Sequence, residues 1–134
     1  MNKRLLKPIV LLLLFLTTGC RHTDSPTVPA AGNAPIFPDY GDSIVLPPNI
    51  APLNFSVTEN IRLRIACGKK ELLDKHYRRQ VRFRPKTWRR WLATARERQQ
   101  PLRLEIATDD RTYAPLHWFV AEDSIDPYLV YRLV

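Results

Sequence analysis

The 134-residue sequence has few of the residues from which catalytic and metal sites are built. Its three histidines, His22, His76 and His117, lie far apart, and no two have the spacing of metal ligands. Its four glycines form no phosphate-binding loop. Neither Ser56 nor Ser124 stands in the glycine-flanked turn of a hydrolase nucleophile. The sequence therefore predicts no catalytic residue, no bound metal and no cofactor, and an enzyme is the least supported class.

Residues 1–19 have the layout of an export signal. Lys3, Arg4 and Lys7 give a positively charged start, and an unbroken apolar run follows at residues 9–16. This run is too short to cross a membrane, which takes about 20 apolar residues, and it fits the apolar core of a secretory signal. We therefore expect residues 1–19 to be a signal peptide.

A cysteine follows this segment directly. Residues 16–20, Leu-Thr-Thr-Gly-Cys, resemble the lipobox of bacterial lipoproteins. The resemblance implies cleavage before Cys20 and lipidation of its thiol with palmitate-like chains, which would hold the protein at a membrane. The next residues, Arg21, His22 and Thr23, do not begin with aspartate. By the same resemblance, we expect a cell-envelope location in the outer membrane, facing the periplasm.

Cys67 is the one cysteine left once Cys20 carries lipid, so the sequence predicts no internal disulfide. It continues the alternation of Ile61, Leu63 and Ile65. We interpret it as a small buried apolar residue rather than a reactive thiol.

The rest of the chain divides by composition. Residues 20–52 contain the lipidated cysteine and a proline-rich segment, which we interpret as an extended tether with little regular structure. Residues 53–134 form the folded domain. Apolar and polar residues alternate there in several runs, which predicts strands at 53–57, 61–65, 80–84, 102–106, 116–120 and 128–134. The turn residues 58–60 would join the first two strands as a hairpin.

One segment of this domain has the period of a helix. Between Pro85 and Pro101, residues 86–99 place four residues on one stripe: Trp88, Trp91, Leu92 and Ala95. The expected fold is mainly β, an antiparallel, Ig-like β-sandwich with one amphipathic helix. The two helix tryptophans and Trp118 are predicted to pack in its core, although a carbohydrate-stacking role is the alternative.

Positive charge is concentrated in the centre of the chain. Without residues 1–19 there are 18 Lys and Arg against 13 Asp and Glu, and residues 62–111 hold 16 basic against 6 acidic residues. This block is either the solvated face of strands and a helix or a contact for anionic ligands. The candidate contact residues are Arg78, Arg79, Arg82, Arg89 and Arg90.

Three segments carry a resemblance to a known family. Residues 36–40 (IFPDY), 46–55 (LPPNIAPLNF) and 123–134 (DSIDPYLVYRLV) resemble the N-terminal region of TolB-like β-propeller lipoproteins of Gram-negative anaerobes. In that family a small β domain precedes the propeller, which is missing here. The resemblance implies a truncated member, an isolated N-terminal domain or a fragmentary gene product, and it assigns no catalytic residue.

Together these features predict a lipid-anchored cell-envelope protein that acts as a non-enzymatic scaffold or interaction module. Two alternatives remain open: a carbohydrate-binding module, and a domain that contacts anionic lipid or lipopolysaccharide. An envelope protein or a glycan is the expected partner. Nucleic acid is not, because an exported protein does not meet it.

Overall fold

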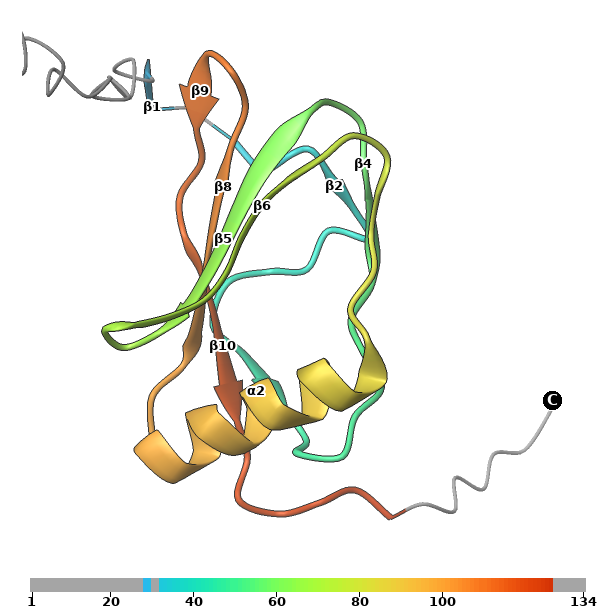
Figure 1. Cartoon of the computed structure of the whole chain (residues 1–134), viewed down its shortest axis with the longest axis vertical. Coiled ribbons are helices and arrows are strands. Elements are labelled where there is room, and N and C mark those ends of the chain that lie inside the picture. The colour runs from blue at the N-terminus through green and yellow to red at the C-terminus, as the bar shows by residue number, and fades with distance from the viewer. Residues whose placement is uncertain (1–27, 30–31, 127–134) are drawn as a thin grey trace, which may run out of the picture.

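Two β-sheets and one helix make up residues 28–29 and 32–126, the part of the chain that the computed structural model describes (Figure 1). The strands are β1 Val28–Pro29, β2 Ile36–Phe37, β3 Ile44–Leu46, β4 Phe55–Val57, β5 Ile61–Cys67, β6 Lys70–Tyr77, β7 Gln80–Val81, β8 Leu102–Ala107, β9 Arg111–Thr112 and β10 Leu116–Val120; the helix is α2 Pro85–Arg98. The expected β-sandwich with one helix is confirmed.

The larger sheet is built around β5. This strand pairs antiparallel with β6 on one side and with β8 on the other. The far edge of β8 pairs with β9 at one end and with β10 at the other. Two short strands add parallel pairs to this otherwise antiparallel sheet, β1 beside β9 and β3 beside β10. Successive side chains of β5 point to opposite faces of the sheet, as the alternating sequence predicted, so Ile61, Leu63 and Ile65 are buried.

The smaller sheet has the strand order β2-β4-β7 and is antiparallel throughout. Phe55 and Val81 are Cα partners in it, and both are buried. Their side chains belong to the same core cluster as Leu63 and Leu104 of the larger sheet. The two sheets therefore pack face to face with one apolar core between them.

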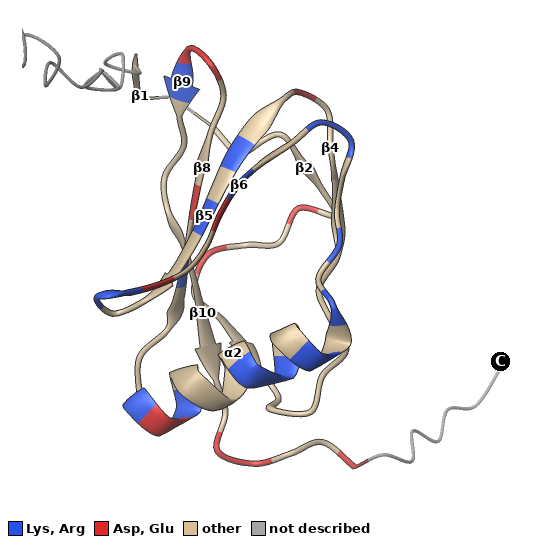
Figure 2. Cartoon of the chain, in the orientation of Figure 1, with Lys and Arg blue, Asp and Glu red and all other residues tan. Residues whose placement is uncertain are grey.

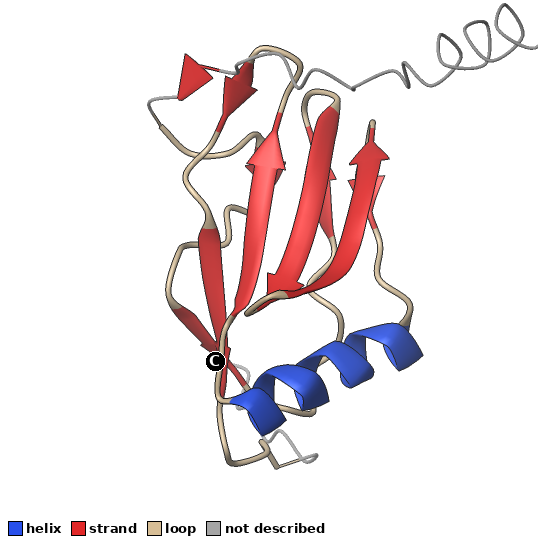
Figure 3. Ribbon diagram, turned by 60° about the vertical axis from the view of Figure 1, so that its left-hand side comes forward, coloured by secondary structure: helices blue, strands red, loops and turns tan. Residues whose placement is uncertain are grey.

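Helix α2 closes one end of this sandwich (Figures 1 and 3). Pro85 stands in its first turn, where its missing N–H costs nothing, and the helix ends at Gln99 with a left-handed conformation, φ 50°. The buried stripe is Trp88, Trp91, Leu92 and Ala95, which confirms the stripe that the sequence predicted.

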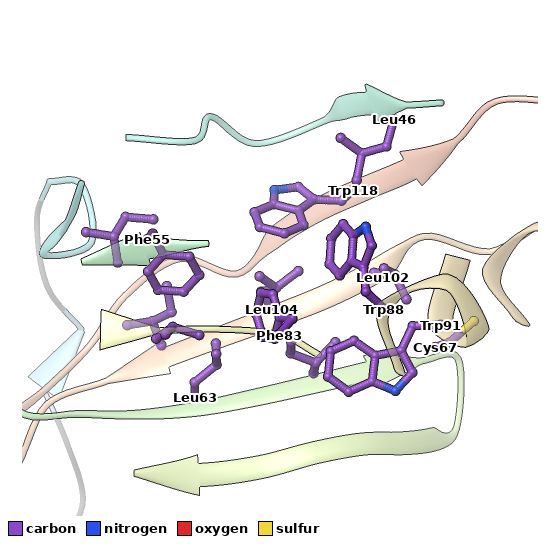
Figure 4. Close-up of a cluster of buried hydrophobic side chains, with 14 of the residues drawn as sticks. Leu46, Phe55, Leu63, Cys67, Phe83, Trp88, Trp91, Leu102, Leu104 and Trp118 are labelled. Atoms are coloured by element: carbon purple, nitrogen blue, oxygen red, sulfur yellow. The ribbon is translucent and has the colours of Figure 1, made fainter. Parts of the chain in front are cut away.

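Aromatic rings fill the space between the helix and the sheets (Figure 4). Trp88 stacks on Phe83 with ring centres 5.4 Å apart and meets Trp118 edge-on at 6.3 Å. Trp88 and Trp118 are fully buried, and Trp91 is 5% exposed. The prediction that the three tryptophans are core residues is confirmed. So is the burial of Cys67, whose exposed fraction is 0%.

The predicted hairpin between residues 53–57 and 61–65 is wrong. β4 pairs with β2 and β7, whereas β5 pairs with β6 and β8 in the other sheet. The turn at residues 58–60 therefore carries the chain across the core from one sheet to the other. The run at 80–84 is also shorter than expected, with only Gln80–Val81 in a strand.

The proline-rich segment contributes to the fold. Three short strands, β1, β2 and β3, lie inside the stretch that we expected to be tether, and Ile36 and Leu46 are buried there. All three strands lie at sheet edges, where proline neighbours are tolerated because one side of the strand needs no partner. The signal peptide, Cys20 and the strand expected at 128–134 lie outside the described residues.

Candidate functional site

The arginines of the described residues fall into two groups that differ in their partners. The first group, Arg62, Arg64 and Arg103, lies on the outer face of the larger sheet. Arg62 donates two hydrogen bonds to the Asp74 carboxylate, at 2.9 and 2.8 Å. Arg64 bridges two neighbouring strands through Glu71 at 3.1 Å and Glu105 at 3.4 Å.

Carboxylates of the same sheet therefore neutralise this first group. The Arg103 guanidinium lies 3.0 Å from the carboxylate of Glu105 on its own strand, β8. The hydrogen bond from Arg62 lowers the pKa of Asp74 below its ordinary value of 3.8, because the guanidinium favours the ionised carboxylate. For these arginines the interpretation of the basic block as a solvated strand face agrees with the structure.

The second group runs from the turn after β6 into α2 and includes all five predicted contact residues. We call it the basic strip; its members are all exposed and lie between the end of β6 and the middle of α2. They are Arg78, Arg79, Arg82, Arg84, Lys86, Arg89 and Arg90. Within residues 28–29 and 32–126, no ion pair joins any of these seven cations to a carboxylate.

Local structure places the basic strip on the surface. After β6 the chain turns at Arg78 and Arg79, and Val81 and Phe83 then point into the core, so Arg82 between them points out. Figure 2 shows Lys and Arg at the turn after β6, along the segment that follows it and on α2. On the helix, the buried stripe leaves the opposite face to the basic residues. The basic strip therefore has two halves, residues 78–84 before the helix and residues 86–90 on the helix, and they are continuous along the chain.

A groove of about 860 Å³ borders the helix half of the strip. Arg89 and Arg96 of α2 line one side, and Phe119 of β10 lies across from them. The side chain of Arg89 reaches back to the carbonyl oxygen of Pro85 at 3.4 Å. Two carboxylates, Glu97 and Glu122, also line the groove, so its charge is mixed.

A second, smaller hollow of about 400 Å³ borders the other half of the strip. It lies on the outer face of the smaller sheet, where Phe37, Ser56 and Gln80 are neighbours in register across the three strands. Arg82 lines the same hollow. Phe37 is 73% exposed, the most exposed large apolar side chain of the described residues. Sequence reasoning missed Phe37, because its segment read as tether and nothing in it signalled a strand.

In the described part of the chain, His117 and the buried thiol of Cys67 both have hydrogen-bond partners. The Asp42 carboxylate accepts a hydrogen bond from the backbone N–H of His117 at 2.7 Å and lies 3.0 Å from its ring Nδ1, which ties the start of β3 to β10. Among the described residues, no three His, Cys, Asp or Glu side chains are grouped to hold a metal ion. No helix there is long and apolar enough to cross a membrane.

Comparison of the chain with protein-family models, with curated proteins and with solved structures gives no match. The resemblance to TolB-like lipoproteins therefore stays a prediction, and the function has to be argued from the residues themselves.

Proposed function

We propose that this chain is a lipid-anchored cell-envelope protein whose β-sandwich serves as an interaction module and not as an enzyme. The observation that carries this proposal is the basic strip. Seven exposed cations stand together without carboxylate partners among the described residues, while the arginines of the larger sheet are paired. Unpaired like charges repel one another, and a partner of opposite charge relieves that repulsion.

Cys20 is the proposed site of membrane attachment. The lipobox that ends in Cys20 supports lipidation, and the apolar run before it supports export of the protein. Eight residue steps separate Cys20 from Val28, whose N–H bonds to the carbonyl oxygen of Asp110 at 3.2 Å. Since an extended chain spans at most about 3.5 Å per residue, the acylated cysteine and β1 would lie within roughly 28 Å of each other. The domain would then work close to the membrane.

The carbohydrate-binding alternative loses its main support. A sugar-stacking platform needs exposed aromatic rings, and Trp88, Trp91 and Trp118 are all buried. Their indoles pack against each other and against Phe83 instead.

The test of the anchor compares the native chain with Cys20→Ala in cells fed labelled palmitate. We expect label on the native chain and none on the variant, together with loss of the mature form from the membrane fraction. Equal labelling of both chains, or no label on either, would refute lipidation at Cys20.

A further inference from the structure

We propose that the domain docks on an anionic phospholipid surface through the outer face of the smaller sheet, with Phe37 entering the headgroup layer and the basic strip contacting the phosphates. This inference deepens the proposed function and rests on it in one respect, because the lipid anchor supplies the nearby membrane. It names the partner of the basic strip.

The exposed position of Phe37 favours a bilayer over a soluble anion as the partner of the basic strip. Its ring is 73% exposed on β2, at the edge of the smaller sheet. The next strands bring Ser56 and Gln80 beside it, and Arg82 follows on the same side of β7. A protruding aromatic ring costs free energy in water but is favoured at a membrane interface, where the ring lies among headgroups and the cations contact phosphates.

The charge on this face suits the same partner. The segment of the chain that carries the basic strip has no acidic residue, since the first carboxylate after Arg78 is Glu97. Asp39, the carboxylate nearest to Phe37 in the chain, accepts a hydrogen bond from Asn33 at 2.6 Å. Each Lys or Arg close to an anionic membrane contributes about 1 kcal/mol, and the attraction decays within a Debye length of about 10 Å at 0.1 M salt. Several cations on one face therefore act together only when that face lies against the surface.

The other exposed apolar residues are placed differently. Val45 and Phe119 are Cα partners on β3 and β10 and are 66% and 42% exposed. They lie on the larger sheet, whose neighbouring arginines are paired with carboxylates. Phe119 shares the larger groove with Arg89 of the basic strip, whereas Val45 lines neither of the two hollows. Val45 therefore provides the apolar control for the docking face.

The test uses the Cys20→Ala chain, which lacks the lipid, and measures its binding to vesicles of phosphatidylethanolamine with phosphatidylglycerol and to vesicles of phosphatidylcholine alone. We expect stronger binding to the anionic vesicles, lost as salt rises from about 0.1 to about 0.5 M. In this background Arg78→Glu with Arg79→Glu should weaken binding to the anionic vesicles about tenfold or more. Phe37→Ala should weaken it about three- to tenfold.

Two matched controls identify the face. Lys69→Glu with Lys70→Glu makes the same change in net charge at the turn between β5 and β6, the opposite end of β6. Val45→Ala removes an exposed apolar side chain from the larger sheet, away from both hollows. We expect either control to change binding less than about threefold.

Three outcomes would overturn the inference. Equal loss from both charge reversals would mean attraction by net charge alone. Equal binding to anionic and neutral vesicles would show that the negative charge of the surface does not drive binding. A loss from the Arg78 and Arg79 reversals with none from Phe37→Ala would show that Phe37 does not enter the headgroup layer and that the proposed docking face is wrong. None of these outcomes bears on palmitate labelling of Cys20, so the anchor and the docking face fail independently.

Discussion

Trp88 donates its indole N–H to the carbonyl oxygen of Ile50, 3.1 Å away. The bond joins the buried face of α2 to the proline-rich segment that precedes β4, 38 residues earlier in the chain. It satisfies a buried donor in the centre of the aromatic cluster, and it holds that segment against the end of the sandwich that the helix closes. The Nε1 of Trp118, 6.3 Å from Trp88 between ring centres, has no acceptor among the described residues.

Because of this contrast, we expect the same substitution to lower the free energy of unfolding by different amounts at these two fully buried tryptophans. Trp88→Phe breaks the bond and leaves the Ile50 carbonyl without its donor, whereas Trp118→Phe removes a buried N–H that has no partner. Both variants lose similar apolar contact. We expect Trp88→Phe to lower the free energy of unfolding by about 1–3 kcal/mol more than Trp118→Phe, measured by urea denaturation. Equal costs would show that the Trp118 N–H has a partner of its own.

The Arg62–Asp74 pair predicts a dependence of stability on pH. Asp74 has a pKa below 3.8 in the folded domain, because Arg62 donates to its ionised form, and a value near 3.8 when unfolded. The pair therefore stabilises the fold above about pH 4, and this contribution disappears as pH falls below 3.8 through the folded pKa. Because both side chains are partly exposed, we expect only about 0.5–1 kcal/mol.

Asp74→Asn isolates this contribution. The native chain should be the more stable of the two at neutral pH, and the difference in the free energy of unfolding should shrink on acidification. A difference that grows as pH falls would contradict the assignment to this ion pair.

Cys67 is the only thiol in the Cys20→Ala chain, and its burial predicts how slowly it reacts with thiol reagents. Its side chain is fully buried, burial raises its pKa, and its Sγ donates to the carbonyl oxygen of Gln100 at 3.9 Å. We expect maleimide to label the folded chain roughly a hundredfold or more slowly than the chain in urea, because labelling requires local opening of the sheet. Rapid labelling without denaturant would mean that this end of β5 is open in solution.

The parts of the fold that the sequence predicted depend on local patterns. The buried stripe of α2 follows from the spacing of Trp88, Trp91 and Leu92, and the strands β5, β8 and β10 follow from alternation. The strand β6 was not predicted, because Lys70–Tyr77 is an edge strand with no buried residue and so shows no alternation. The wrong hairpin has a similar cause, since alternation marks a strand but does not identify its partner.

The candidate site was predicted only in part. The sequence pointed to Arg78, Arg79, Arg82, Arg89 and Arg90, and the structure places all five in one exposed strip. The sequence could not distinguish these five arginines from Arg62 and Arg64. The carboxylates that neutralise Arg62 and Arg64 come from other strands, Glu71 and Asp74 from β6 and Glu105 from β8. Phe37 could be recognised as an exposed candidate only from the structure, which places β2 at the edge of the smaller sheet.

The orientation of the lipidated protein on a membrane tests the central claim most directly. A spin label or fluorophore is attached through Gln80→Cys, beside Phe37 on the docking face, or through Val45→Cys on the larger sheet; Cys67 is buried and should not take the probe. Both chains are reconstituted in vesicles whose phosphatidylglycerol-containing surface carries a headgroup quencher. We predict strong quenching of the probe at residue 80 and weak quenching at residue 45, with the difference lost at high salt. Equal quenching at the two positions, or stronger quenching at residue 45, would contradict the account.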